Sequence, residues 1–208
     1  MKGLIFSVVT LFCIVSNSYA LPIISTFDTD TEGWTASGAF VTHENTGGNP
    51  DGFLSITDND FDTATAIAPA KFEGNLLAFD GGLLSYDFIV LEPKIPLSSV
   101  GSGFGRIQMN GGGSNATFSY IDPPIPSIDF WKTYYVPLTA QAWNTTQENW
   151  EKVLSDVQHI DIIIQAGTTI GIDNFQIASV PEPSSMLLLS VGLFGRVILR
   201  RHKSHTIV

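Results

Sequence analysis

Carboxylates are the most abundant side chains in this sequence that could do chemistry. Between Leu21 and Val180 the chain has 19 acidic and five basic residues, which gives this segment a net charge of −14. Two carboxylates at a suitable separation could act as the acid and base of a glycosidase, but no motif singles out one pair. Gly-x-Ser-x-Gly and His-Glu-x-x-His motifs do not occur in the sequence. These observations favour a protein without catalytic activity.

Metal-ligating patterns are also sparse. Thr42-His43-Glu44 reads as a surface loop, and His159 begins an apolar strand, which indicates a structural role. The acidic loop Asp58-Asn59-Asp60-Phe61-Asp62 has the alternating oxygen ligands that suit calcium, but it lacks the glycine and the distal glutamate of an EF-hand. So few Lys and Arg residues exclude nucleic acid as a partner, because such binding depends on neutralising phosphates.

Aromatic side chains could form a platform for sugars, which stack on aromatic faces. We expect Trp34, after Gly33, and Trp150, on the apolar face of a predicted helix, to lie in the core. Tyr134 and Tyr135 should point to opposite faces of one strand, so that at most one of them is buried. The complete set of candidates is Trp34, Trp131, Trp143, Trp150, Tyr120, Tyr134 and Tyr135.

Short apolar runs separated by turns must position these side chains. Leu84, Tyr86, Phe88 and Val90 alternate with polar residues and predict a half-buried strand. The other predicted strands are 23–27, 53–57, 63–68, 106–110, 116–121, 131–136, 159–165 and 171–178. One helix is predicted, from the capping box Thr145-Thr146-Gln147-Glu148 followed by Trp150, Val153, Leu154 and Val157 at helical spacing. This pattern predicts an all-β fold, a single jelly-roll-type β-sandwich with one short helix.

The N-terminal end has the features of a secretory signal peptide, residues 1–20. Lys2 precedes an apolar run from Leu4 to Val15, and small residues at positions 18 and 20 place the signal-peptidase cut after Ala20. Cys13, the only cysteine, lies inside this segment, so the mature chain would form no disulfide.

The C-terminal end has an apolar run followed by a basic cluster. The 14 residues from Met186 to Leu199 would span about 21 Å as a helix, against roughly 30 Å of hydrocarbon. The cluster of Arg200, Arg201 and Lys203 would stay in the cytoplasm by the positive-inside rule. We therefore expect a short C-terminal transmembrane helix, with the domain outside the membrane and the basic cluster inside.

Val180, Pro181, Glu182 and Pro183 stand before this apolar run. In this order, the motif, the apolar segment and the basic cluster resemble the PEP-CTERM sorting signal of Gram-negative bacteria, here over residues 180–203. The resemblance implies recognition by an exosortase and a cut near the motif. It also implies transient anchoring in the inner membrane and release to the cell surface or the exopolysaccharide matrix. A simple C-terminal anchor is the alternative.

Several stretches of the middle segment resemble known β-sandwich families. APAKFEGNLLAFDGGLLSYDF, residues 68–88, resembles the laminin IV type A (laminin B) domain, and residues 131–143, 153–166 and 172–179 follow in the order of that family. FDTDTEGWTASG, residues 27–38, looks like the first strands of carbohydrate-binding jelly rolls. These resemblances imply one sandwich domain over residues 21–179.

The jelly-roll resemblance also implies a structural calcium ion. Asp28 and Asp30 follow the first predicted strand and Asp173 lies in the last one, and these strands are neighbours in many jelly rolls. Calcium is held by carboxylate and carbonyl oxygens. The resemblance makes all three aspartates candidate ligands, with turn and backbone hydrogen bonds as the alternative role for Asp28 and Asp173.

Three functions are compatible with these features. The first is a secreted, non-catalytic surface or matrix protein, sorted by an exosortase, whose sandwich binds exopolysaccharide or other matrix glycans. The alternative is a purely structural surface or matrix protein without a small ligand, and a carbohydrate-active enzyme is the third choice. A row of solvent-facing aromatic side chains on one sheet would favour the first function over the second.

Overall fold

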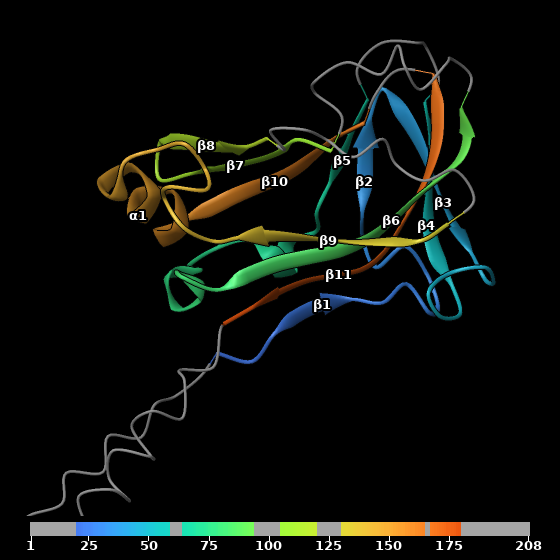
Figure 1. The fold of residues 1–208 in the computed structure, drawn as a ribbon, viewed down its shortest axis with the longest axis horizontal. Helices are drawn as coiled ribbons and strands as arrows, with labels where there is room; N and C mark the ends of the chain where they lie inside the picture. Colours follow the sequence, from blue (N-terminus) through green and yellow to red (C-terminus); the bar gives the residue numbers. More distant parts are fainter. Residues whose placement is uncertain (1–19, 59–63, 94–104, 120–129, 165–166, 180–208) are drawn as a thin grey trace, which may run out of the picture.

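The computed structural model describes residues 20–58, 64–93, 105–119, 130–164 and 167–179. They form two antiparallel sheets packed face to face (Figure 1). The large sheet has the order β3-β4-β11-β6-β9, and β1 pairs with β11. Its strands are β1 (Ile23–Ser25), β3 (Ala39–Glu44), β4 (Phe53–Asp58), β6 (Leu83–Pro93), β9 (Lys132–Pro137) and β11 (Thr168–Ala178). The predicted all-β sandwich of jelly-roll type is confirmed.

The small sheet has the order β2-β5-β10-β7-β8. Its strands are β2 (Thr35–Ser37), β5 (Ala64–Ile67), β7 (Ile107–Gly111), β8 (Ser114–Phe118) and β10 (Val157–Ile164). β7 and β8 form a hairpin around the glycine run at residues 111–113. Gly112 and Gly113 both have positive φ, 54° and 72°, as a tight hairpin turn of two residues requires.

The core lies between the two sheets and is rich in aromatic rings. Ile160, Ile162 and Ile164 of β10 point inward and are at most 1% exposed. Tyr86 and Phe88 of β6, which the alternating pattern of the sequence placed on one face of a strand, are likewise buried. Trp34, Trp143 and Trp150 are also buried, with Trp34 in edge-to-face contact with Phe27, Phe72 and Phe175.

The predicted helix is present as α1 (Gln147–Ser155), beside the two short 3₁₀ helices η1 (Ala70–Phe72) and η2 (Leu77–Phe79). Its N-cap is Thr146, whose hydroxyl accepts from the Asn149 N–H at 3.2 Å. The capping box predicted from the sequence, with Thr145 as the N-cap and Glu148 three residues after it, was therefore wrong: the N-cap lies one residue later. Glu148 instead forms an ion pair with Lys152, and Val157 belongs to β10.

Two further predictions need correction. β6 is not half-buried, because residues 84–90 are buried on both faces. Thr42-His43-Glu44 is not a loop but the end of β3, at one edge of the large sheet. β2 and β3 were missed because their outward residues are exposed and their inward residues are only half-buried, which leaves a weak apolar alternation.

The two end segments lie outside the residues that the structure describes. The signal peptide, except for Ala20, and all of residues 180–203 belong to these segments. Within the described part of the chain, no helix reaches the length and apolar character needed to cross a membrane. The predicted transmembrane helix is therefore still a prediction.

Candidate functional site

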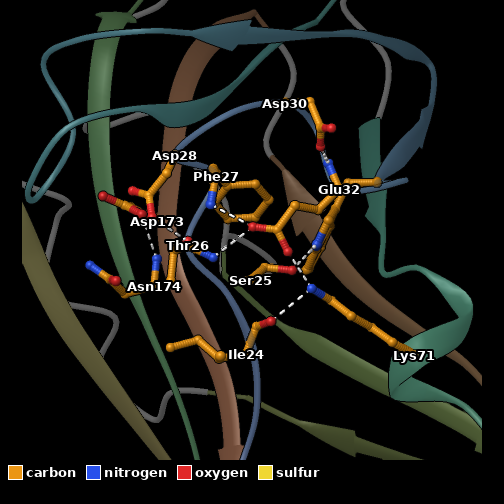
Figure 2. Close-up of polar contacts among 11 residues, drawn as sticks. Ile24, Ser25, Thr26, Phe27, Asp28, Asp30, Glu32, Lys71, Asp173 and Asn174 are labelled. Atoms are coloured by element: carbon orange, nitrogen blue, oxygen red, sulfur yellow. Dashed lines mark hydrogen bonds and ion pairs between the residues drawn. The ribbon is translucent and has the colours of Figure 1, made fainter.

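The turn after β1 is held by one partly exposed ion pair and its hydrogen bonds. Glu32 Oε1 accepts from the backbone N–H groups of Thr26 and Phe27, at 2.8 and 2.7 Å, and its other oxygen pairs with Lys71 (Figure 2). Burial raises the pKa of the Glu32 carboxyl, but the Lys71 ammonium and the two N–H donors lower it further, to below its usual value. These contacts fix Phe27 at φ 55° and turn the chain towards Asp28.

This turn separates the two aspartates that follow β1. Asp30 Oδ1 accepts from the Glu32 N–H at 2.6 Å, which holds Asp30 on the side of the turn near Glu32. Asp28 lies on the other side, beside Asp173 of β11 (Figure 2). The structure therefore brings together Asp28 and Asp173 of the three predicted calcium ligands and leaves Asp30 apart. Asp28 Oδ2 also accepts from the Thr26 hydroxyl at 2.8 Å.

Asp173 has a second acidic neighbour that the sequence analysis missed. Asp87 of β6 stands opposite Asp173 in the strand register, and the two side chains are 5% and 0% exposed. Asp173 accepts from the N–H groups of Asn49 and Asn174, at 2.6 and 2.7 Å. Asp87 accepts from the side-chain amides of the same two asparagines and from the Thr133 hydroxyl.

The surroundings of Asp173 disfavour the ionised form of its carboxyl group. Burial raises the pKa of its carboxyl to about 6, and the charges of Asp87 and Asp28 add to this rise. The two backbone N–H groups act in the opposite direction without compensating it. Asp173 is therefore the carboxylate of this site that would gain most from a nearby cation.

A loop segment that we call the strap, residues 47–51, covers this pair from outside. The Trp131 indole N–H donates to the Gly47 carbonyl at 2.8 Å, and the Asn174 amide donates to the Asn49 carbonyl. A Cβ atom on Gly48 would lie 2.2 Å from the Gly52 carbonyl oxygen and 2.9 Å from Asp173 Oδ2. Only glycine fits this approach. The strap covers Asp87 on the outer face of β6 through Asn49.

The donor set suits a hard cation only in part. Carboxylate and amide oxygens are calcium ligands, and Asp28 and Asp173 point towards each other. Within the described ranges, however, no group of three or more His, Cys, Asp or Glu side chains is arranged to hold a metal ion. A calcium ion here would take its other ligands from backbone or amide oxygens. In the second acidic loop, Asp58 is a buried strand residue that accepts from the Gly167 N–H, and residues 59–62 lie outside the described ranges.

The outer face of the large sheet, which points away from the small sheet, carries aromatic and hydroxyl side chains. Tyr135 of β9 is 60% exposed and Phe40 of β3 is 64% exposed, whereas Tyr134 is buried on the inner face, as the alternation predicted. The half-buried Trp131 ring packs edge-to-face on Phe53 at 5.4 Å.

The ring of Trp131 can lie against the sheet because β11 has a glycine beneath it. A Cβ atom on Gly171 would lie 2.8 Å from the Trp131 ring. Hydroxyl groups on the outer face of the large sheet lie near the exposed rings of Phe40 and Tyr135. Thr57 and Thr169 form a hydroxyl pair at 3.3 Å, and the Gln176 amide donates to the Ser85 hydroxyl at 3.0 Å.

The carboxylates near α1 have structural roles. Asp80 accepts from the Trp150 indole N–H at 2.7 Å and from the Gln147 amide at 3.3 Å. Glu151 accepts from the same amide at 3.0 Å. Asp80 and Glu151 line an open pocket beside η2, but each of these two carboxylates already has a donor. Of the histidines, His43 Nε2 lies 2.7 Å from the Phe27 carbonyl, and His159 is exposed on β10.

Comparisons with known proteins agree with the predicted sorting signal and with the predicted sandwich fold. Residues 179–203 match the family model of the PEP-CTERM protein-sorting motif, which confirms that the chain carries this signal. The fold is similar to the L4b domain of human laminin α-2, with a TM-score of 0.56 and 14% identity over 77% of this chain and 99% of that chain. The predicted laminin-like sandwich is thereby confirmed. No curated protein matches the sequence.

Two other solved structures contain a related fold. An exo-β-agarase has a TM-score of 0.55 and 17% identity, over 81% of this chain but only 26% of the agarase. The family 11 carbohydrate-binding module of a cellulosomal cellulase of Clostridium thermocellum has a TM-score of 0.48 and 12% identity, over 80% of this chain and 99% of the module. At such identities, similarity shows a fold and not a function.

Proposed function

We propose that this protein is a secreted, non-catalytic surface or matrix protein that an exosortase cuts and releases from the inner membrane. The observation that carries the proposal is the sorting motif at residues 179–203. It directly follows β11, the last strand of a domain that is held together without disulfides. The proposed cut lies near Val180, Pro181, Glu182 and Pro183, and the basic residues Arg200, Arg201 and Lys203 would hold the tail in the cytoplasm until then.

The sandwich domain binds exopolysaccharide or another matrix glycan in this proposal. The support comes from the outer face of the large sheet, where the exposed Tyr135 ring lies beside the Ser85–Gln176 pair. The exposed Phe40 ring lies on the opposite edge strand, beside the Thr57–Thr169 pair. Sugars combine apolar ring faces with hydroxyl groups, so they need such mixed surfaces. A purely structural matrix protein is the alternative, and a carbohydrate-active enzyme is the third choice.

A glycan array, together with a pull-down on exopolysaccharide from the producing cells, tests the binding function. We expect the purified domain to be retained, and Tyr135→Ala to weaken retention roughly threefold to tenfold, the value of one aromatic contact. His159→Ala is the matched control, because His159 is exposed on the small sheet. If no glycan retains the parent domain, the purely structural alternative takes the place of this proposal.

We further propose a structural calcium ion between the first turn and the last strand. Asp28 and Asp173 would be its side-chain ligands, because they face each other and because the raised pKa of Asp173 marks a site that lacks positive charge. Asp30, the third candidate from the sequence, would instead keep its hydrogen bond to Glu32. The ion would tie β1 to β11 in a domain whose net charge is strongly negative.

A further inference from the structure

The strap crosses the outer face of the large sheet. It belongs to the connection between β3 and β4, and it reaches over β11 and β6. Asn49 donates to Asp173 of β11 through its backbone N–H and to Asp87 of β6 through its side-chain amide. The Gly47 carbonyl accepts from the indole of Trp131, the residue directly before β9. The strap therefore extends from the β4 side of the sheet to its β9 side.

The two exposed rings of this face lie on opposite sides of the strap. The strand register places Phe40 level with Thr169 of β11, whereas Tyr135 is level with Gln176. Asp173, over which the strap passes, lies between these two levels of β11. A ligand lying flat on the sheet could not contact both rings, so the face offers two separate surfaces.

The surface around the Tyr135 ring is built from four neighbouring strands, β1, β11, β6 and β9, which Figure 1 shows side by side. We call it the terminal surface, because it lies beside the end of β11. The residues that alternate with its members along the strands point into the core. Its members are Ile24, Gln176, Ser85 and Tyr135 in one row, with Leu83 and Pro137 in the next. None of these six is an Asp, Glu, Lys, Arg or His residue.

The terminal surface combines apolar contact area with uncharged hydrogen-bonding groups. Ile24 and Tyr135, at the two ends of its first row, are 42% and 60% exposed. Between them the Gln176 amide donates to the Ser85 hydroxyl at 3.0 Å. Among the described residues, neither the Gln176 carbonyl oxygen nor the Tyr135 hydroxyl has a hydrogen-bond partner. Both groups are therefore available to the hydroxyl groups of a ligand.

The charged groups next to the terminal surface are already paired or covered. The Lys71 ammonium donates to the Ile24 carbonyl at 2.7 Å, but it also forms the ion pair with Glu32 (Figure 2). Asp87 and Asp173 lie beneath the strap and are only 5% and 0% exposed. A charged sugar on this surface would thus meet no free opposite charge from the described residues.

We propose that the terminal surface binds an uncharged segment of the matrix glycan, without carboxylate, sulfate or amine groups. The apolar faces of its sugars would pack on Tyr135 and Ile24, and their hydroxyl groups would bond to Gln176. A carboxylate or sulfate would lose its hydration here without gaining an opposite charge, and the negative domain would repel it. The inference rests on the glycan binding of the proposed function and specifies the class of glycan.

A glycan with free amines is the less suitable ligand, although the domain is strongly acidic. Its positive charge would be attracted by the net charge of the whole domain and not by the terminal surface, which has no carboxylate of its own. Salt screens attraction of this kind, whereas it leaves apolar packing and hydrogen bonds between uncharged groups largely unchanged. The salt dependence of binding therefore distinguishes the two kinds of ligand.

The probe for this inference is exopolysaccharide from the producing cells, separated on ion exchangers into uncharged, acidic and basic fractions. We expect the purified exported protein to be retained on the uncharged fraction. Retention should be equal at about 0.1 M and about 1 M salt, between which the Debye length falls from roughly 10 Å to 3 Å.

Three variants that add the same charge at exposed positions locate the site. Ile24→Lys and Tyr135→Lys should each lower retention at least about threefold, because each removes an apolar contact and adds an unpaired charge. Phe40→Lys is the matched control and should keep the retention of the parent, because Phe40 lies on the other side of the strap. Thermal unfolding shows which variants fold, and either of the first two is sufficient for the test.

The results that would overturn the inference differ from the result that would contradict glycan binding. Retention on the acidic or the basic fraction alone would overturn the proposed class of glycan, and an equal loss in Phe40→Lys would overturn its place on the sheet. A parent that sediments as a dimer, with Ile24→Lys as a monomer, would show that a second copy occupies the terminal surface instead. A parent that no fraction retains would contradict the proposed glycan binding itself.

Discussion

Asp173 shows how the environment of one residue can shape the stability of this domain. Its carboxyl is fully buried opposite Asp87, and burial raises its pKa from the usual 3.8 to about 6. At a pH between these two pKa values, Asp173 is protonated in the folded state but ionised in the unfolded state. The free energy of unfolding from this group therefore rises as the pH falls from about 7 to about 4, by roughly 3 kcal/mol.

We expect Asp173→Asn to lose this part of the pH dependence. Urea unfolding at pH 5 and pH 7 in the presence of EDTA measures it as the difference between parent and variant. Asp30→Asn is the control, because Asp30 is exposed and an asparagine there can still accept from the Glu32 N–H. A variant at position 173 whose stability changes with pH as much as the parent's would show that another group is responsible.

Calcium should have an effect on stability that depends on Asp28 and Asp173. An ion at 100 times its dissociation constant would add about 2.7 kcal/mol to the free energy of unfolding. We expect calcium to raise the melting temperature of the parent and of Asp30→Asn, but not that of Asp28→Asn or Asp173→Asn. Equal melting temperatures in calcium and EDTA would reject the site, and an equal rise with magnesium would indicate screening of the net charge.

At this scale the sequence could predict only part of the site. Asp28 and Asp173 were found through a resemblance to jelly rolls, and the structure does bring them together. Asp87 and Asn49 were missed because β6 and the strap carry no pattern that links them to Asp173, which is 124 positions from Asn49. Only the paired strands and the Gly48 contact bring these residues into one place.

The strands with strong apolar alternation were the predictable elements. β10 has three isoleucines on its inner face, and the β7–β8 hairpin has glycines where the turn needs positive φ. β3 was missed because it is an edge strand with only partly buried inward residues. The helix began one residue later than predicted because Thr146, and not Thr145, caps the Asn149 N–H.

Two neighbouring positions of β10 test the role of this strand. Ile162 is fully buried between the sheets, whereas Ile163 is half-buried on the outer face. We expect Ile162→Asp to abolish cooperative folding, because an unpaired carboxylate would enter the core. Ile163→Asp should keep a cooperative thermal transition at a lower temperature. If Ile162→Asp melts like the parent in circular dichroism, the placement of β10 in the core is wrong.

At the scale of the whole molecule, the sorting signal directly follows the sandwich on which we propose that glycans bind. Both chain ends leave at the same end of the sandwich, and the rings of Tyr135 and Phe40 lie on the outer face of the large sheet. The sequence could predict the sorting signal because its motif, apolar run and basic cluster follow one another in the chain. It could not predict which aromatic side chains are exposed, because that depends on contacts between distant strands.

Intact mass spectrometry of the protein recovered outside the cell tests the central claim most directly. The proposed function predicts one species that begins at Leu21 and ends near Pro181 to Pro183, without the apolar run or the basic cluster. The mass would thus report both cuts at once and define a domain that corresponds to the described sandwich. An exported protein whose mass still includes the chain as far as Val208 would contradict the account.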